Sequence, residues 1–232
     1  MHGKFGVNNS MEIIILVSLL VLGLIIGSFM NVVIYRVPRN LSIVSPGSKC
    51  SSCNSEVKPY DNIPVLSYIL LGGKCRKCKE KISIRYPLVE LLVGILYVLC
   101  YLFLGLTVEL ILGLIFVTCA VGIIFIDIDF KIIPDSFIVI IGLLGIGIMV
   151  NNFINAGFDG VVLNILGFVF GLGIFLIIRL AGSMIYKKEA MGLGDVKLMA
   201  VAGLYLGLLN TFLTILISSV LASIIEVTLI KL

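Results

Sequence analysis

Charged side chains are scarce in this sequence. They make up 13% of its 232 residues, whereas 60% of the residues are hydrophobic and the mean hydropathy is +1.22. A typical soluble domain carries about 25% charged residues, so the composition excludes a water-soluble globular protein. There is also only one histidine, His2, to which we assign no role. The chain is therefore expected to lie in a lipid bilayer.

The apolar residues gather into about seven segments that could cross a membrane, since a spanning helix needs roughly 20 mostly apolar residues. We therefore predict an all-α polytopic membrane protein with about seven to eight transmembrane helices. No small-x-small cleavage site follows the first segment, so we expect it to remain as an anchor. Glycines spaced four apart at Gly167-x-x-x-Gly171 and Gly203-x-x-x-Gly207 predict close helix packing. The segments are Met11–Ile34, Leu88–Leu104, Val108–Ile126, Phe137–Val150, Val161–Ile178, a short one near Val196–Leu208, and Thr211–Ile230.

Most of the positive charge lies in one polar insert. Ten of the 17 Lys and Arg residues fall between Arg36 and Arg85. Because positive loops stay in the cytoplasm, we expect the insert to be cytoplasmic, and with it the loops at Lys131 and Lys187–Lys188 and the terminal Lys231. Base stacking would require aromatic residues interleaved with this charge; they are missing, so we expect no nucleic-acid partner. The predicted parts are a tail and first helix (1–35), the insert (36–86) and a membrane domain (87–232).

Four cysteines in the insert form two pairs, Cys50-x-x-Cys53 and Cys75-x-x-Cys78, with 21 residues between them. Each pair can supply two thiolates to one ion, and two pairs complete the closed tetrahedral shell of a structural zinc site. Neighbouring lysines and Arg76 favour thiolates over thiols. Two disulfides are the alternative, which a reducing cytoplasm disfavours. We therefore predict a small zinc-knuckle insert.

Two acidic motifs stand at predicted helix ends. Asp127 lies in Phe125-Ile126-Asp127-Ile128-Asp129, and Asp195 ends Gly192-Leu193-Gly194-Asp195. The predicted topology places both on the cytoplasmic side, where a pair of carboxylates sharing one proton could activate water and protonate a leaving amine. Asp195 and Asp135 could instead be helix N-caps. Asp127 ends a helix, where a negative charge opposes the macrodipole, so a structural role explains it less well.

Several motifs, in order, resemble the type IV prepilin leader peptidases, which are membrane aspartyl peptidases with a Gly-x-Gly-Asp motif. They are the Gly192–Asp195 motif, Asp127 followed by Ile133-Pro134-Asp135, the paired cysteines, and two further signatures. The signatures are Gly27-Ser28-Phe29-Met30-Asn31-Val32-Val33-Ile34-Tyr35-Arg36-Val37-Pro38 and Arg85-Tyr86-Pro87-Leu88-Val89-Glu90-Leu91. The resemblance spans nearly the whole chain, although the family is usually drawn with eight spans and we resolve about seven.

The resemblance implies that Asp127 and Asp195 are the catalytic carboxylates, with Asp129 and Asp135 in support. It also implies a multi-pass protein of the inner or plasma membrane that removes the short basic leader of type IV prepilins or pseudopilins, as pilus and protein secretion systems require. Many members then methylate the new amino terminus with S-adenosylmethionine. For this cofactor we name Glu90 as a candidate residue, and no glycine-rich dinucleotide loop is present.

Two other function classes remain open from the residues. A presenilin-type intramembrane protease would share the pair of aspartates but not the cysteine insert. An ion-coupled transporter could also carry intramembrane acids, but it needs a continuous polar path, and the helices Val108–Ile126 and Thr211–Ile230 offer only scattered polar residues. The insert therefore distinguishes the three classes.

Overall fold

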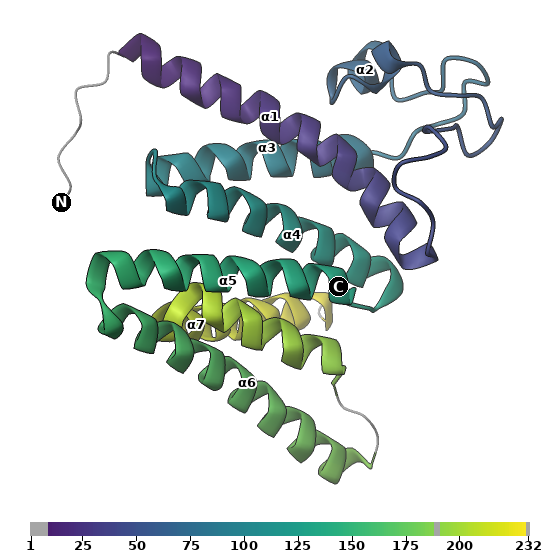
Figure 1. Cartoon of the computed structure of the whole chain (residues 1–232). Coiled ribbons are helices and arrows are strands. Elements are labelled where there is room, and N and C mark those ends of the chain that lie inside the picture. Colours follow the sequence, from purple (N-terminus) through teal and green to yellow (C-terminus); the bar gives the residue numbers. More distant parts are fainter. Residues whose placement is uncertain (1–8, 188–190, 231–232) are drawn as a thin grey trace. The chain divides into compact units, whose positions relative to one another are not determined.

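A computed structural model describes residues 9–187 and 191–230, and its long regular elements are helices (Figure 1). His2, Lys188 and Lys231 lie outside these residues. Six helices are long and apolar enough to cross a membrane, judged by length and composition. The prediction of an all-helical membrane protein is thus confirmed. The elements are α1 (Asn9–Arg36), η1 (Val37–Arg39), η2 (Pro59–Asn62), α2 (Leu66–Leu70), α3 (Arg85–Leu104), α4 (Val108–Phe130), α5 (Asp135–Ala156), α6 (Phe158–Tyr186) and α7 (Leu193–Ile230).

The number of spans differs from the prediction of seven to eight. Six candidate spans are found among the described residues, because the last two predicted segments are counted together as α7. Gly207, with φ 75° and ψ 171°, breaks α7 into two helices close to the predicted boundary between these segments. Side chains satisfy carbonyl groups at this break: Asn164 of α6 donates to the Leu204 carbonyl over 2.8 Å, and Thr211 donates to the Gly207 carbonyl over 2.6 Å. A break inside a membrane helix requires such partners.

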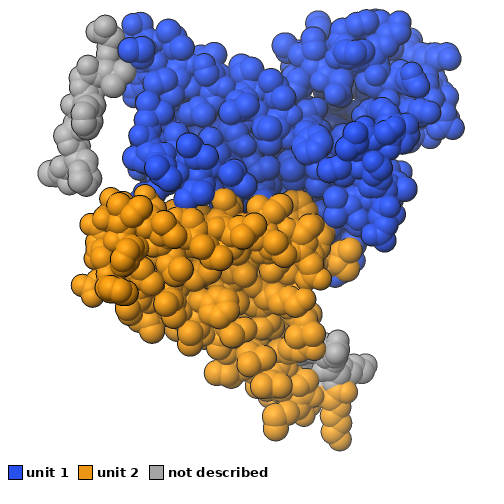
Figure 2. Space-filling model, in the orientation of Figure 1, with its two compact units in different colours: residues 1–131 blue, residues 132–232 orange. Residues whose placement is uncertain are grey.

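The chain divides into two compact units, residues 1–131 and 132–232 (Figure 2). In the first unit α1 packs against α3, and α3 against α4. The α1–α3 contact depends on glycine. A Cβ atom on Gly23 would lie 2.6 Å from the Gly94 Cα, and one on Gly27 would lie 2.7 Å from the Glu90 Cα. Any larger residue at these two positions of α1 would push the helices apart.

The second unit consists of α5, α6 and α7, with its largest contact between α6 and α7. Here too the backbones touch at glycines. A Cβ on Gly203 would lie 2.7 Å from the carbonyl carbon of Gly167, and one on Gly167 would lie equally close to the carbonyl carbon of Gly207. Small residues allow this approach in lipid, where dispersion contacts drive helix association. The close packing predicted for the two Gly-x-x-x-Gly motifs is confirmed.

Candidate functional site

Asp127 lies in the last turn of α4, beside the fully buried Ile126 and with its own side chain partly exposed. The helix ends because Lys131 adopts a left-handed conformation with φ 56°. In that conformation its backbone N–H donates to the Asp127 carbonyl over 2.9 Å, which satisfies one of the carbonyls left open at a helix end. This hydrogen bond fixes the backbone of Asp127, while its side chain remains partly exposed at the end of the helix.

Arg85, at the start of α3, holds the end of α4 on both sides of Asp127. Its guanidinium forms an ion pair with Asp129 and donates a hydrogen bond to the Phe125 carbonyl over 2.9 Å. The guanidinium also lies 5.0 Å from the centre of the Phe125 ring, a cation–π distance. The sequence motif that contains Arg85 assigns this residue no role. The ion pair could have been suspected from the opposite charges of Arg85 and Asp129, each of which lies at a predicted helix end.

Asp195 lies in the first turn of α7. The helix begins at Leu193, so Asp195 is inside the helix and is not its N-cap. Glycines leave room around it: a Cβ on Gly192 would lie 3.3 Å from an Asp195 carboxylate oxygen, and one on Gly194 would lie 3.2 Å from the Ile133 Cβ. The Gly-x-Gly sequence thus allows the backbone to approach Ile133, in the segment before α5, and leaves space beside the carboxylate.

Asp135 is also not a cap, because Pro134 holds the N-cap position of α5. Its carboxylate accepts from Lys197, two residues after Asp195, over 3.0 Å. Asp127 belongs to the first unit and Asp195 to the second, and their pairing stays a prediction. Within their own units, among the described residues, Asp129 and Asp135 are in ion pairs, whereas Asp127 and Asp195 have no ion-pair partner.

The four cysteines of the insert come together. Their sulfur atoms all lie within 4.8 Å of one another, and those of Cys50 and Cys78 are 3.8 Å apart. Thiolates about 2.3 Å from a tetrahedral ion would be separated by roughly 3.8 Å. All four are free thiols rather than disulfides. The donor set and its spacing therefore fit one metal ion, as the cysteine spacing predicted, and zinc remains the proposed metal.

Each cysteine pair sits in a tight turn of the same design. The Cys50 N–H donates to the Ser55 carbonyl over 2.9 Å, and the Cys75 N–H donates to the Glu80 carbonyl over 2.8 Å. The N–H groups of Cys78 and Lys77 turn toward the Cys75 sulfur and lower its pKa from 9.0 to about 6. Donors that stabilise the thiolate also favour metal binding.

Glu90 is 7% exposed and accepts a hydrogen bond over 2.8 Å from the backbone N–H of Val65, a residue of the insert with φ 59°. A buried carboxylate without such a donor would be costly. Glu90 therefore connects the insert to α3. The two residues are 25 positions apart in sequence, and hydropathy alone does not predict such a contact. Its candidate role toward S-adenosylmethionine stays a prediction.

Sequence comparisons cover most of the chain. Residues 21–104 match the bacterial Peptidase A24 N-terminal domain, and residues 114–227 match the type IV leader peptidase family. A prepilin leader peptidase/N-methyltransferase of Myxococcus xanthus is 42% identical, over 82% of this chain and 56% of its own length. Proteins of that name from Neisseria gonorrhoeae and Pseudomonas aeruginosa are 35% and 34% identical, over 86% and 92% of this chain and 77% and 80% of theirs. No solved structure matches this chain. On these matches the chain belongs to the type IV leader peptidase family.

Proposed function

We propose that the protein is a membrane aspartyl endopeptidase that removes the short basic leader from type IV prepilins or pseudopilins at the cytoplasmic face of the inner or plasma membrane. Asp127 and Asp195 are its catalytic carboxylates. The names of the relatives support the substrate class. The basic insert supports the cytoplasmic orientation, because positive loops stay inside. Family membership favours this function over the presenilin-type protease and the transporter, neither of which accounts for the cysteine insert.

The observation that carries the assignment of the two aspartates is the contrast between free and paired carboxylates. Near each candidate, a second aspartate of the same unit is held by a cation, Asp129 by Arg85 and Asp135 by Lys197. Asp127 and Asp195 have no ion-pair partner within their own units among the described residues. The same holds for Asp159 in the first turn of α6, which the Gly-x-Gly-Asp motif does not include. A carboxylate that must exchange a proton cannot be locked in an ion pair, because a neighbouring cation favours its ionised form.

The proposed chemistry needs one aspartate ionised and one protonated. The ionised carboxylate removes a proton from water as the water oxygen attacks the scissile carbonyl carbon, and the protonated carboxyl hydrogen-bonds to the carbonyl oxygen. The peptide C–N bond then breaks as the leaving nitrogen receives a proton. Two like charges in contact cannot both ionise near neutral pH, so the pair itself would keep one proton available. No metal takes part in these steps, and zinc in the insert is structural.

We further propose that the protein methylates the new amino terminus with S-adenosylmethionine, as the names of the relatives support. Glu90 is the candidate residue for this activity. When bound, S-adenosylmethionine would supply a methyl group from its sulfonium, which would be left as a thioether, and the terminal amine would lose a proton. Mass spectrometry of a mature pilin separates the two reactions, because cleavage removes the leader and methylation adds one methyl mass.

The test of catalysis replaces each aspartate with asparagine in the full-length protein and follows precursor cleavage by mass spectrometry. General acid–base catalysis contributes about 100-fold to 10,000-fold, so Asp127→Asn and Asp195→Asn should each lose at least about 100-fold. The double variant should be little worse, because the pair acts as a unit. The control is Asp135→Asn, which removes only a well-exposed ion pair and should keep substantial activity. Near-normal cleavage by Asp195→Asn would refute the assignment.

A further inference from the structure

The length of α3 fixes its depth in the membrane. It contains 20 residues, Arg85–Leu104, and at about 1.5 Å per residue it is roughly 30 Å long. The hydrocarbon core of a bilayer is also about 30 Å thick. A helix of this length reaches from one interface of the core to the other. The first turn of α3, with Arg85, therefore lies at the membrane interface, and Leu91 lies roughly 9 Å further along the helix.

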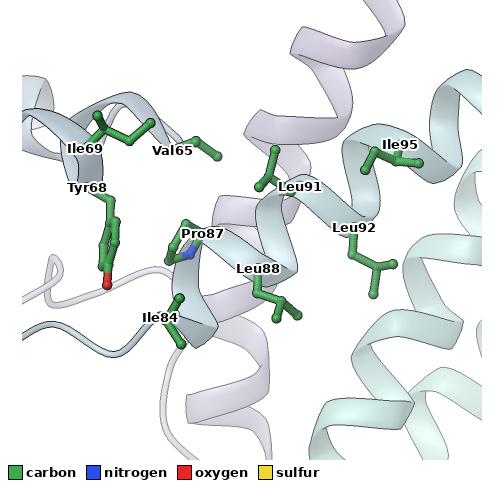
Figure 3. A pocket seen from close by; sticks show the side chains of 9 residues that line it. All are labelled: Val65, Tyr68, Ile69, Ile84, Pro87, Leu88, Leu91, Leu92 and Ile95. Carbon is green, nitrogen blue, oxygen red and sulfur yellow. The ribbon is translucent and has the colours of Figure 1, made fainter. Parts of the chain in front are cut away.

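Part of the insert lies beside these same turns. The Val65 N–H donates to the Glu90 carboxylate, and α2 begins at the next residue. Side chains of α2 and α3 line an open apolar groove of about 480 Å³ (Figure 3). Because the α3 wall of the groove begins at this interface, α2 beside it lies at the level of the interface as well. The groove is lined by Val65, Tyr68 and Ile69 from the insert and by Leu88, Leu91 and Ile95 from α3.

The outer surface of α2 is apolar as well. Leu66, Ile69 and Leu70 are 58%, 66% and 83% exposed, whereas the only polar side chain of the helix other than Tyr68 is Ser67, which is buried. A helix of five residues is not stable by its own hydrogen bonds. Facing water, three exposed aliphatic side chains would add a further cost of hydration. Both problems are solved if an apolar phase covers this surface.

We infer that α2 is a membrane-interface segment and that bilayer lipid is its partner. Acyl chains cover Leu66, Ile69 and Leu70 and fill the groove against α3. Lipid is favoured over a soluble protein as the occupant, because the α3 wall of the groove belongs to a candidate membrane-spanning helix. The neighbouring η2 fits the headgroup layer: Tyr60 is exposed, and the cations of Lys58 and Arg76 lie 5.5 Å from its ring. Tyrosine and basic side chains are enriched at this level.

The test exploits the absence of tryptophan from the chain. A single Leu70→Trp substitution in the full-length protein places one fluorophore on the proposed lipid-facing surface, and Leu66→Trp provides a second. The control is Val44→Trp, at a residue of the insert that is 87% exposed and distant in sequence from α2. Each variant is reconstituted alone in phosphatidylcholine vesicles whose acyl chains carry bromine either near the headgroup or near the methyl end.

For Leu70→Trp and Leu66→Trp we expect blue-shifted emission that is quenched at least twofold more strongly by shallow bromine than by deep bromine. Val44→Trp should emit as in water and be quenched by acrylamide instead. Three outcomes would overturn the inference. They are water-like emission from both α2 variants, blue-shifted emission without bromine quenching, which would mean that protein covers α2, and equal bromine quenching at Val44→Trp. None of these results depends on peptidase activity, so the proposed function can fail separately.

Discussion

Replacing Arg85 with methionine should lower the cleavage rate by about 30-fold while leaving the fold and the cysteine cluster intact. Arg85 contacts α4 at Phe125 and Asp129, the residues two positions before and after Asp127. Without these contacts the last turn of α4 keeps its own backbone bonds and the contact of Phe130 with Arg39, but loses the cation that holds it on both sides of Asp127. The carboxylate of Asp127 then samples more positions, and fewer of them suit the reaction.

The magnitude follows from the two contacts. Arg85 and Asp129 are 32% and 33% exposed, so solvent screens their ion pair and it contributes about 1 kcal/mol at most. A hydrogen bond from a charged donor to a carbonyl contributes roughly 1.5 kcal/mol. Their sum of about 2.5 kcal/mol is an upper limit, because water replaces part of what is lost. An effect of about 2 kcal/mol on the barrier corresponds to about 30-fold in rate.

The assay is kcat and KM for a membrane-anchored precursor in proteoliposomes. Asp129→Asn removes only the ion pair, and its kcat should fall by about fivefold, which corresponds to about 1 kcal/mol on the barrier. Combining Arg85→Met with Asp129→Asn should add little to Arg85→Met alone, because the two residues share one interaction. Arg85→Lys keeps the charge but lacks the fork that reaches both partners, and should fall between Arg85→Met and the wild type.

The matched control is Arg39→Met, which removes a cation that also touches the end of α4. Arg39 lies over the rings of Tyr35 and Phe130 but donates its hydrogen bond to Tyr35 of α1. The cleavage rate of the Arg39→Met variant should fall by no more than about threefold, as expected for the loss of a weak cation–π contact. A rate within twofold of wild type for Arg85→Met would refute the reasoning, as would a loss that appears only in KM.

Two further predictions concern the metal site and the packing of the helices. Metal analysis of the purified protein should find one zinc per chain, and Cys75→Ser should lower that ratio; near-zero zinc with all four insert thiols open to alkylation would contradict the metal site. Gly203→Ala should cost about 1–3 kcal/mol, the usual range for overpacking, and lower the melting temperature in detergent. Gly173→Ala, where an added Cβ meets no atom within 4 Å, is the control and should be neutral or stabilising; equal melting temperatures for the two variants would disprove the glycine contact.

Local patterns in the sequence predicted the features that depend on neighbouring residues. Hydropathy located the helices α1 and α3 to α6. A long apolar segment in lipid must satisfy its own backbone hydrogen bonds, and a helix does so. The spacing of the cysteines predicted the cluster, because one ion limits how far apart four ligands lie. The predicted boundary after Leu208 lies next to the break at Gly207, where glycine adopts a positive φ without steric cost.

The contacts that fix the candidate site join residues distant in sequence, and single-residue reasoning could not find them. Arg85 and Asp129 are 44 positions apart, and Asp135 and Lys197 are 62 apart. Their pairing depends on how helices are arranged, which hydropathy does not encode. The position of Val65 against Glu90 has the same origin. The choice of Asp127 and Asp195 rests on motif and chemistry, and remains a prediction for the experiments above.

The glycine contact between α1 and α3 has a consequence for the biosynthesis of the protein. The two helices are separated by the whole insert, residues 37–84, so α3 does not exist when α1 enters the membrane. At about 5–20 residues per second, synthesis of the insert takes roughly 2–10 s. During that time the backbone of α1 at Gly23 and Gly27 is exposed to lipid. This surface can then associate with α1 of another nascent chain or with an unrelated helix. Slow translation of the insert should therefore increase misassembly at α1.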